Sequence, residues 1–164
     1  ARFDALLDED LPLDPEELSR LRAFAPRFTE LCRELAALGI PETIQHDDLH
    51  MANVYANGDT LRILDWGDSS ISHPFASLFV TFRFLEEVTK PSPVDPWFDR
   101  LRDAYLEPWG NGLAGAFSLA LRVGSFAHVF AWIRQRSYLP AEERADWDNW
   151  FPGVLRRAMR QALD

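Results

Sequence analysis

Apolar residues recur every three or four positions near the start of the chain, and this spacing predicts an amphipathic helix over residues 14–37. The repeating residues are Leu18, Leu21, Phe24, Phe28, Leu31 and Leu35. The pair Asp14-Pro15 is typical of a helix start, because a carboxylate caps the first turn and proline suits its first position. We expect Pro26 to kink or split this helix and Gly39 to help end it.

The helical pattern disappears after residue 40, and short β-prone runs take its place at 43–45, 53–56 and 61–64. The last two runs flank Asn57-Gly58-Asp59, which is typical of a hairpin turn. We therefore expect a polar loop over residues 46–52 that leads into a small hairpin, which ends at Asp65-Trp66-Gly67.

Helical periodicity returns after Pro74 and continues to the end of the chain. The predicted helices cover residues 74–88, 94–105, 112–138 and 141–163. The third is apolar on nearly all sides, which is typical of a buried central helix. We expect the fourth to break near Pro152.

These elements predict an α+β fold that is mostly α. We expect a single domain over residues 1–164. Its parts are a leading helical segment, 1–39, a loop and hairpin segment, 40–73, and a helical subdomain, 74–164.

Composition narrows the classes of function. The net charge of −9 argues against a nucleic-acid-binding surface, which is normally basic. No uninterrupted apolar run reaches the roughly 18 residues that span a bilayer, so we expect no membrane partner. Cys32 is the only cysteine, which favours the reducing cytoplasm and a packed rather than a reactive thiol.

The candidate chemistry lies in the polar loop and directly after the hairpin. His46, Asp48 and Asn53 have the His-x-Asp-x4-Asn spacing of the protein-kinase catalytic loop, and Asp65 follows twelve residues after Asn53. Phosphoryl transfer needs a carboxylate to orient the acceptor hydroxyl and oxygen ligands for magnesium. The spacing therefore predicts Asp48 as the base and Asn53 and Asp65 as magnesium ligands.

The stretch from residue 45 to residue 78 resembles the aminoglycoside phosphotransferase and choline-kinase-like family. That family carries His-Gly-Asp-Leu-His-x-x-Asn and then Ile-x-Asp-Trp, which appear here as His46-Asp47-Asp48-Leu49-His50-Met51-Ala52-Asn53 and Ile63-Leu64-Asp65-Trp66. The resemblance implies a protein-kinase-like C-terminal lobe. It implies that Asp48 is the base, that His46 orders the loop, and that Asn53 and Asp65 bind Mg²⁺. The implied reaction moves the γ-phosphate of ATP, or of GTP, to a hydroxyl of a small molecule.

The chain departs from this family pattern in three ways. Asp47 replaces a glycine, so the backbone there must avoid a glycine conformation or accept strain. The segment 73–78 lacks two aspartates that often cap the next helix and brace the loop in the family. No glycine-rich loop or strand lysine precedes residue 40, and the only lysine is Lys90.

From the third departure we expect the nucleotide-binding N-terminal lobe to be absent from this chain, which leaves the nucleotide-binding residues unassigned. A working kinase then needs about 100 further residues upstream. We expect the isolated chain to be an inactive fragment whose partners are that lobe and a small hydroxyl-bearing substrate.

Three further polar residues lie beside the predicted site: Asp47, His50 and Asp68. They are candidates for binding a cationic substrate, with local packing for His50 and solvated charge for the aspartates as the alternatives. We expect Trp66 to pack locally. We expect Trp132, Trp147 and Trp150 to belong to the core.

Two other functions compete with a kinase. In a metal-dependent hydrolase, His46, Asp48 and His50 would share one face of a strand and bind zinc together with Asp65. In a silent kinase-like module, the site would only bind a partner. The intact set of Asp48, Asn53 and Asp65 favours the kinase, although the sequence does not define its acceptor.

Overall fold

The computed structural model describes residues 13–92 and 95–163. The contacts in this part of the chain divide into two compact units, one of residues 38–124 and one of the residues before 38 together with those after 124. The expected single domain over residues 1–164 stays a prediction. Helices predominate, with two small antiparallel strand pairs, so the α+β, mostly α class is confirmed.

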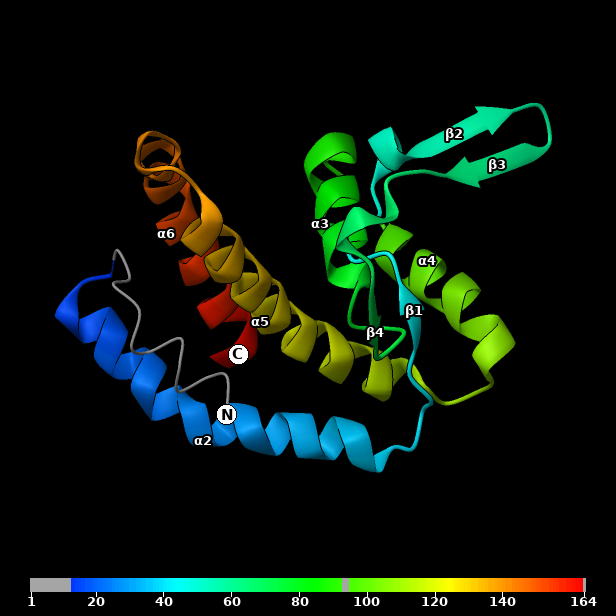
Figure 1. Ribbon diagram of the computed structural model, residues 1–164. Helices are drawn as coiled ribbons and strands as arrows, with labels where there is room; N and C mark the ends of the chain where they lie inside the picture. Colours follow the sequence, from blue (N-terminus) through cyan, green and yellow to red (C-terminus); the bar gives the residue numbers. More distant parts are fainter. Residues whose placement is uncertain (1–12, 93–94, 164) are drawn as a thin grey trace. The chain divides into compact units, whose positions relative to one another are not determined.

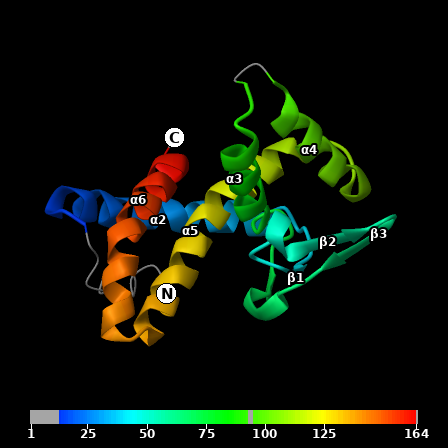
Figure 2. The ribbon, with the colours of Figure 1, turned by 90° about the horizontal axis from the view of Figure 1, so that it is seen from above.

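The unit that contains the first helix, α2 (Pro15–Ala37), also contains α6 (Ala141–Leu163) and the later part of α5 (Ala114–Tyr138). Figures 1 and 2 both show α6 beside this part of α5. The predicted apolar stripe of α2 is confirmed, since five of its residues are buried: Leu21, Phe24, Phe28, Leu31 and Leu35. Phe24 and Phe28 pack against Phe126 with ring centroids 5.1 and 5.3 Å apart.

Proline does not divide either long helix of this unit. The expected break near Pro152 is wrong and Pro26 does not split its helix, because α2 and α6 run continuously through these residues. A kink at Pro26 stays a prediction. Each proline removes one hydrogen-bond donor from its helix. The neighbouring Phe151 and Leu155 are fully buried, and burial of this size offsets that cost.

The tryptophans of this unit are divided between core and surface. Trp147 is 6% exposed and stacks on Phe151 with a centroid separation of 3.8 Å, as expected of a core residue. Trp132 packs edge-on against Trp150, and Trp150 is 45% exposed. The core expectation is therefore wrong for Trp150, which lies at the edge of the cluster.

The unit of residues 38–124 contains both strand pairs. β2 (Val54–Asn57) and β3 (Thr60–Ile63) form the predicted hairpin, and both ribbon views show it extending away from α3 (Leu78–Thr89) (Figures 1 and 2). Its two-residue turn begins at Gly58, whose φ of 58° explains why glycine is there. β1 (Thr43–Gln45) pairs with β4 (Ser70–Ser72), a strand that the sequence did not predict.

The helices of this unit begin later than expected. α3 begins at Leu78 instead of Pro74, because residues 74–77 form a turn in which the His73 Nδ1 atom accepts the Phe75 N–H at 3.2 Å. α4 (Trp97–Leu106) follows, and the predicted start at residue 94 lies outside the described residues. The first part of α5 completes the unit, whose aromatic core contains Phe75, Phe82, Phe98, Tyr105 and Phe117.

Helix α5 is long and apolar enough to cross a membrane by length and composition alone, with a mean hydropathy of 1.4 over its most apolar window. Core helices of water-soluble proteins have the same composition, and Phe117, Phe126 and Val129 of α5 are fully buried. The absence of a membrane partner stays a prediction.

Candidate functional site

The polar loop lies between β1 and β2 and contains a short 3-10 helix, η1 (Met51–Asn53). Asp47 has a φ of 61°, so the residue that replaces the glycine of the family pattern has a left-handed backbone, and the loop accepts some strain there. Aspartate tolerates this conformation better than most residues. Its carboxylate also accepts a hydrogen bond from the Ser70 hydroxyl, which ties the loop to β4.

His46 joins the loop to the segment after the hairpin. Its ring is 6% exposed, and Nε2 lies 2.7 Å from the Leu64 carbonyl oxygen. Because a carbonyl only accepts hydrogen bonds, the ring proton is on Nε2. The Leu64 N–H donates in turn to the Asn53 carbonyl oxygen at 2.8 Å. Both backbone groups of Leu64 therefore bind the loop, directly before Asp65.

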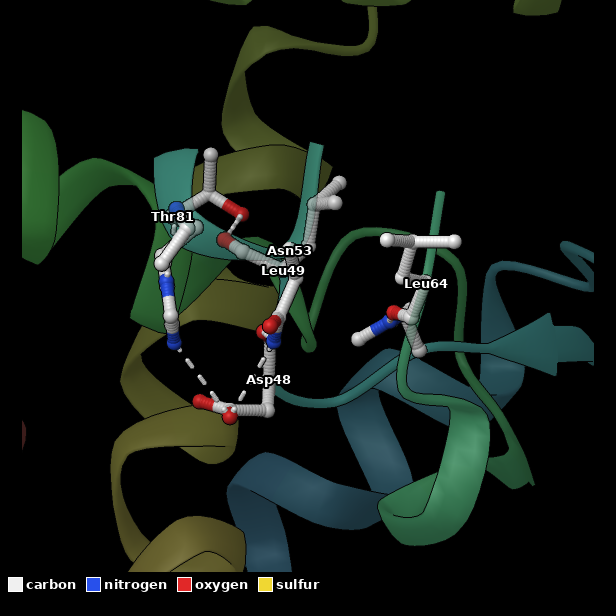
Figure 3. A network of polar contacts seen from close by, with 8 residues as sticks. Asp48, Leu49, Asn53, Leu64 and Thr81 are labelled. Carbon is white, nitrogen blue, oxygen red and sulfur yellow. Dashed lines mark hydrogen bonds and ion pairs between the residues drawn. The ribbon is translucent and has the colours of Figure 1, made fainter. Parts of the chain in front are cut away.

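His50 and Asn53 both approach one carboxylate oxygen of Asp48. Figure 3 shows Asn53 beside Asp48. Asn53 Nδ2 donates to the Asp48 backbone oxygen at 2.9 Å and lies 3.5 Å from Asp48 Oδ2. His50 Nε2 lies 3.5 Å from the same oxygen. The Asp48 side chain remains 40% exposed and therefore accessible to a ligand.

Asp65, Trp66 and Asp68 are exposed. Asp65 directly precedes the 3-10 helix η2 (Trp66–Asp68), and its side chain makes no capping hydrogen bond. Asp65 also has a left-handed backbone, with φ of 58°. Among the described residues, no hydrogen bond or ion pair joins the Asp65 or Asp68 carboxylate to the Asp48 group. Trp66 packs its ring 4.9 Å from that of His46 and donates to the Ile63 carbonyl, in agreement with a packing role.

Helix α3 braces the loop without the aspartates of the family pattern. The Thr81 hydroxyl donates to the Leu49 carbonyl oxygen at 2.7 Å (Figure 3), and the Ser77 hydroxyl donates to Gln45 Oε1 at 2.5 Å. The Phe84 ring stacks on His50 at 4.9 Å. Ser77 does not cap α3 with its side chain, so the helix start lacks the usual cap while the loop keeps its support.

Burial shifts two ionisable groups beside the loop. Partial burial raises the pKa of Asp47, against the smaller opposing effect of the Ser70 hydrogen bond. Burial also lowers the pKa of His73, which favours the neutral ring whose Nδ1 accepts from Phe75. Neither group faces the Asp48 carboxylate through a hydrogen bond in the described part of the chain.

The predicted magnesium ligands offer suitable oxygen atoms. Asn53 uses its Nδ2 toward Asp48, which leaves Oδ1 without a hydrogen bond among the described residues. The Asp65 carboxylate is exposed and likewise uncommitted there. Amide and carboxylate oxygens are the ligand types that Mg²⁺ prefers, so the donor set fits this ion.

The geometry does not favour a zinc-dependent hydrolase. His46 Nε2 is engaged with Leu64, and no three His, Cys, Asp or Glu side chains within residues 13–92 and 95–163 are grouped to hold a metal ion. A catalytic zinc site normally uses three such ligands.

Sequence reasoning missed the residues that support the loop from outside it: Leu64, Ser70, Ser77, Thr81 and Phe84. Leu64 acts through its backbone, which leaves no signal in its side chain. Thr81 and Phe84 lie more than 30 positions from their partners on the loop. The hydroxyl of Thr81 on an otherwise apolar helix face was the one available signal.

Comparison with protein families gives a match that covers most of the chain. A model of the phosphotransferase enzyme family matches residues 1–117, which include the whole loop, both strand pairs, α3 and α4. Searches of curated proteins and of solved structures return no significant match.

Proposed function

Because this chain belongs to the phosphotransferase enzyme family, we propose that it is the part of a small-molecule kinase that binds the metal and the acceptor. Family membership itself implies a phosphotransferase function. Kinases of this family generally use ATP and Mg²⁺. The acceptor in our proposal is a hydroxyl group of a small molecule, phosphorylated by ATP or GTP.

One observation carries this proposal, namely the double hydrogen bond of Leu64. Its carbonyl accepts from His46 and its N–H donates to Asn53. The loop and the residue before Asp65 are thus held in one framework, although 18 positions separate His46 from Leu64. Fixed separation of a base and two metal ligands is what phosphoryl transfer requires of a protein.

In this proposal each residue has a distinct task. Asp48 accepts the proton of the acceptor hydroxyl as the hydroxyl oxygen takes up the phosphoryl group and the nucleoside diphosphate leaves. Asn53 and Asp65 hold Mg²⁺, which when bound neutralises charge on the phosphates. His46 keeps the loop in place. Asp47 is engaged with Ser70, which makes it a weaker candidate for substrate binding than the exposed Asp68.

We also propose that the nucleotide-binding lobe is supplied by residues outside this chain. Lys90, the only lysine, has a left-handed backbone at the C-terminal end of α3 and lies on no strand. Uncovered apolar residues on the strand pairs support this proposal. The cross-strand neighbours Ile44 and Ile71 are 70% and 74% exposed, and Leu61 is 70% exposed.

The test is a screen of the full-length protein. It is incubated with magnesium–ATP, magnesium–GTP and a panel of hydroxylated metabolites, and release of nucleoside diphosphate is measured together with the mass of the acceptor. We expect the screen to give a phosphorylated acceptor, and we expect its phosphorylation to depend on Mg²⁺. Hydrolysis of phosphate esters with stoichiometric zinc would refute it. Nucleotide binding without turnover of any acceptor would favour the silent binding module.

A further inference from the structure

His50 is held between two fixed partners. Its Nδ1 accepts the Ala52 N–H at 3.2 Å and thereby caps η1. Its ring stacks on Phe84 of α3, with centroids 4.9 Å apart and planes inclined by 22°. These contacts fix both the position and the rotation of the ring.

The contact at Nδ1 also fixes the proton of the neutral ring. A backbone N–H is a donor, so Nδ1 contributes a lone pair and the proton is on Nε2. Nε2 is the atom that faces Asp48 Oδ2 at 3.5 Å. His50 therefore presents an N–H to the carboxylate, at a distance that catalytic hydrogen bonds often have before substrate binds.

The two oxygens of Asp48 are thus in different surroundings. Oδ2 is approached by His50 Nε2 and by Asn53 Nδ2, both at 3.5 Å. Oδ1 has no hydrogen bond or ion pair among the described residues, and the side chain is 40% exposed. A carboxylate oxygen that already faces two donors is the weaker proton acceptor of the pair.

From this arrangement we propose that His50 is a positioning residue for Asp48. With Asn53 it holds Oδ2 and turns Oδ1 toward the acceptor, so that Oδ1 receives the hydroxyl proton. This inference rests on the proposed kinase function and adds to it the residue that orients the base. Phe84 and Thr81 on α3 support it indirectly, because they fix the ring and the Leu49 carbonyl between Asp48 and His50.

Two substitutions at one position separate positioning from packing. His50→Phe keeps an aromatic ring against Phe84 and removes the N–H, whereas His50→Gln removes the ring and keeps an N–H donor. In the full-length protein, turnover of magnesium–ATP is measured as ADP release, first with water alone and then with the acceptor found in the screen.

We expect His50→Phe to lower kcat by about tenfold to a hundredfold with little change in KM for magnesium–ATP, since a hydrogen bond to a charged group is lost. His50→Gln should retain more activity than His50→Phe. Wild-type kcat in His50→Phe, or a lower kcat in His50→Gln than in His50→Phe, overturns the inference and leaves His50 as a packing residue.

A second measurement does not depend on the variants folding. Nitrogen NMR of the ¹⁵N-histidine-labelled full-length protein should show His50 with its proton on Nε2, and a proton on Nδ1 overturns the inference. Asp48→Asn distinguishes failure of the positioning role of His50 from failure of the proposed kinase function. If Asp48→Asn is inactive and His50→Phe is active, only the positioning role fails. If Asp48→Asn is fully active, the proposed function fails.

Discussion

Strain at single residues is concentrated around the site. Asp47, Asp65 and Lys90 are the non-glycine residues with positive φ in the described part of the chain, and the first two belong to the loop and to the predicted metal segment. Such backbone conformations cost on the order of 1 kcal/mol each and persist where surrounding contacts hold them. At Asp47 that contact is the Ser70 hydroxyl.

Asp47 gives a prediction about pH. Because burial raises the pKa of its carboxyl, the folded chain retains this proton over a pH range in which the unfolded chain has lost it, and stability falls as pH rises through that range. Asp47→Asn cannot ionise and tolerates the same backbone. It should therefore stabilise the protein more at about pH 7 than at about pH 4.

Urea unfolding at both pH values measures this difference, with Asp59→Asn on the hairpin turn as the control for loss of one negative charge. An Asp47→Asn effect that is equal at the two pH values would contradict the assigned direction of the pKa shift.

At the scale of elements, α5 meets the turn before α3 at unusually short range. A Cβ atom on Gly124 would lie 2.3 Å from the Ala76 carbonyl oxygen, so only glycine fits there. Ala76 is followed by Ser77, which binds Gln45, the residue before His46. The close approach thus fixes the turn that supports the loop.

Gly124→Ala should destabilise the protein by about 1–3 kcal/mol, because backbone atoms of the turn cannot move aside without disturbing the loop. Gly153→Ala is the matched control. Nothing lies within 4 Å of its added Cβ, and alanine in a helix interior should stabilise by about 0.5–1 kcal/mol. Thermal unfolding compares them, and equal effects of the two variants would show that the contact is not tight.

The same elements show how far sequence reasoning reaches. The apolar stripe of α2 and the turn at Gly58 were predictable, since both depend on residues close together in sequence. Strand β4 was not, because Ser70-Ile71-Ser72 is too short for a pattern and is defined only by pairing with β1. Pro152 was misleading for the same reason, since the tertiary burial of its neighbours outweighed a local preference.

The candidate site was likewise predictable from the sequence only in part. Spacing identified Asp48 and Asn53, which the structure brings together, but it could not reveal that His50 stacks on Phe84. A ring contact across 34 positions depends on how α3 packs on the loop. The positioning role proposed for His50 could therefore be inferred only from the structure, and not from the sequence.

At the scale of the whole molecule, the proposed division of labour predicts weak nucleotide binding. A protein of residues 1–164 alone should bind magnesium–ATP with a Kd weaker than about 1 mM, because Mg²⁺ ligands without a phosphate-binding lysine supply little affinity. Isothermal titration calorimetry measures this Kd. Micromolar affinity would show that this chain contains a complete nucleotide site.

The assignment of Asp48 as the base of a phosphotransferase is tested most directly by kcat of Asp48→Asn in the full-length protein. If Asp48 is the base, kcat falls by about 10²- to 10⁴-fold while the fold is unchanged, as is typical of removing a general base. Asp59→Asn, the same chemical change on the hairpin turn, should keep the wild-type kcat. Wild-type turnover by a folded Asp48→Asn protein would show that Asp48 is not the base.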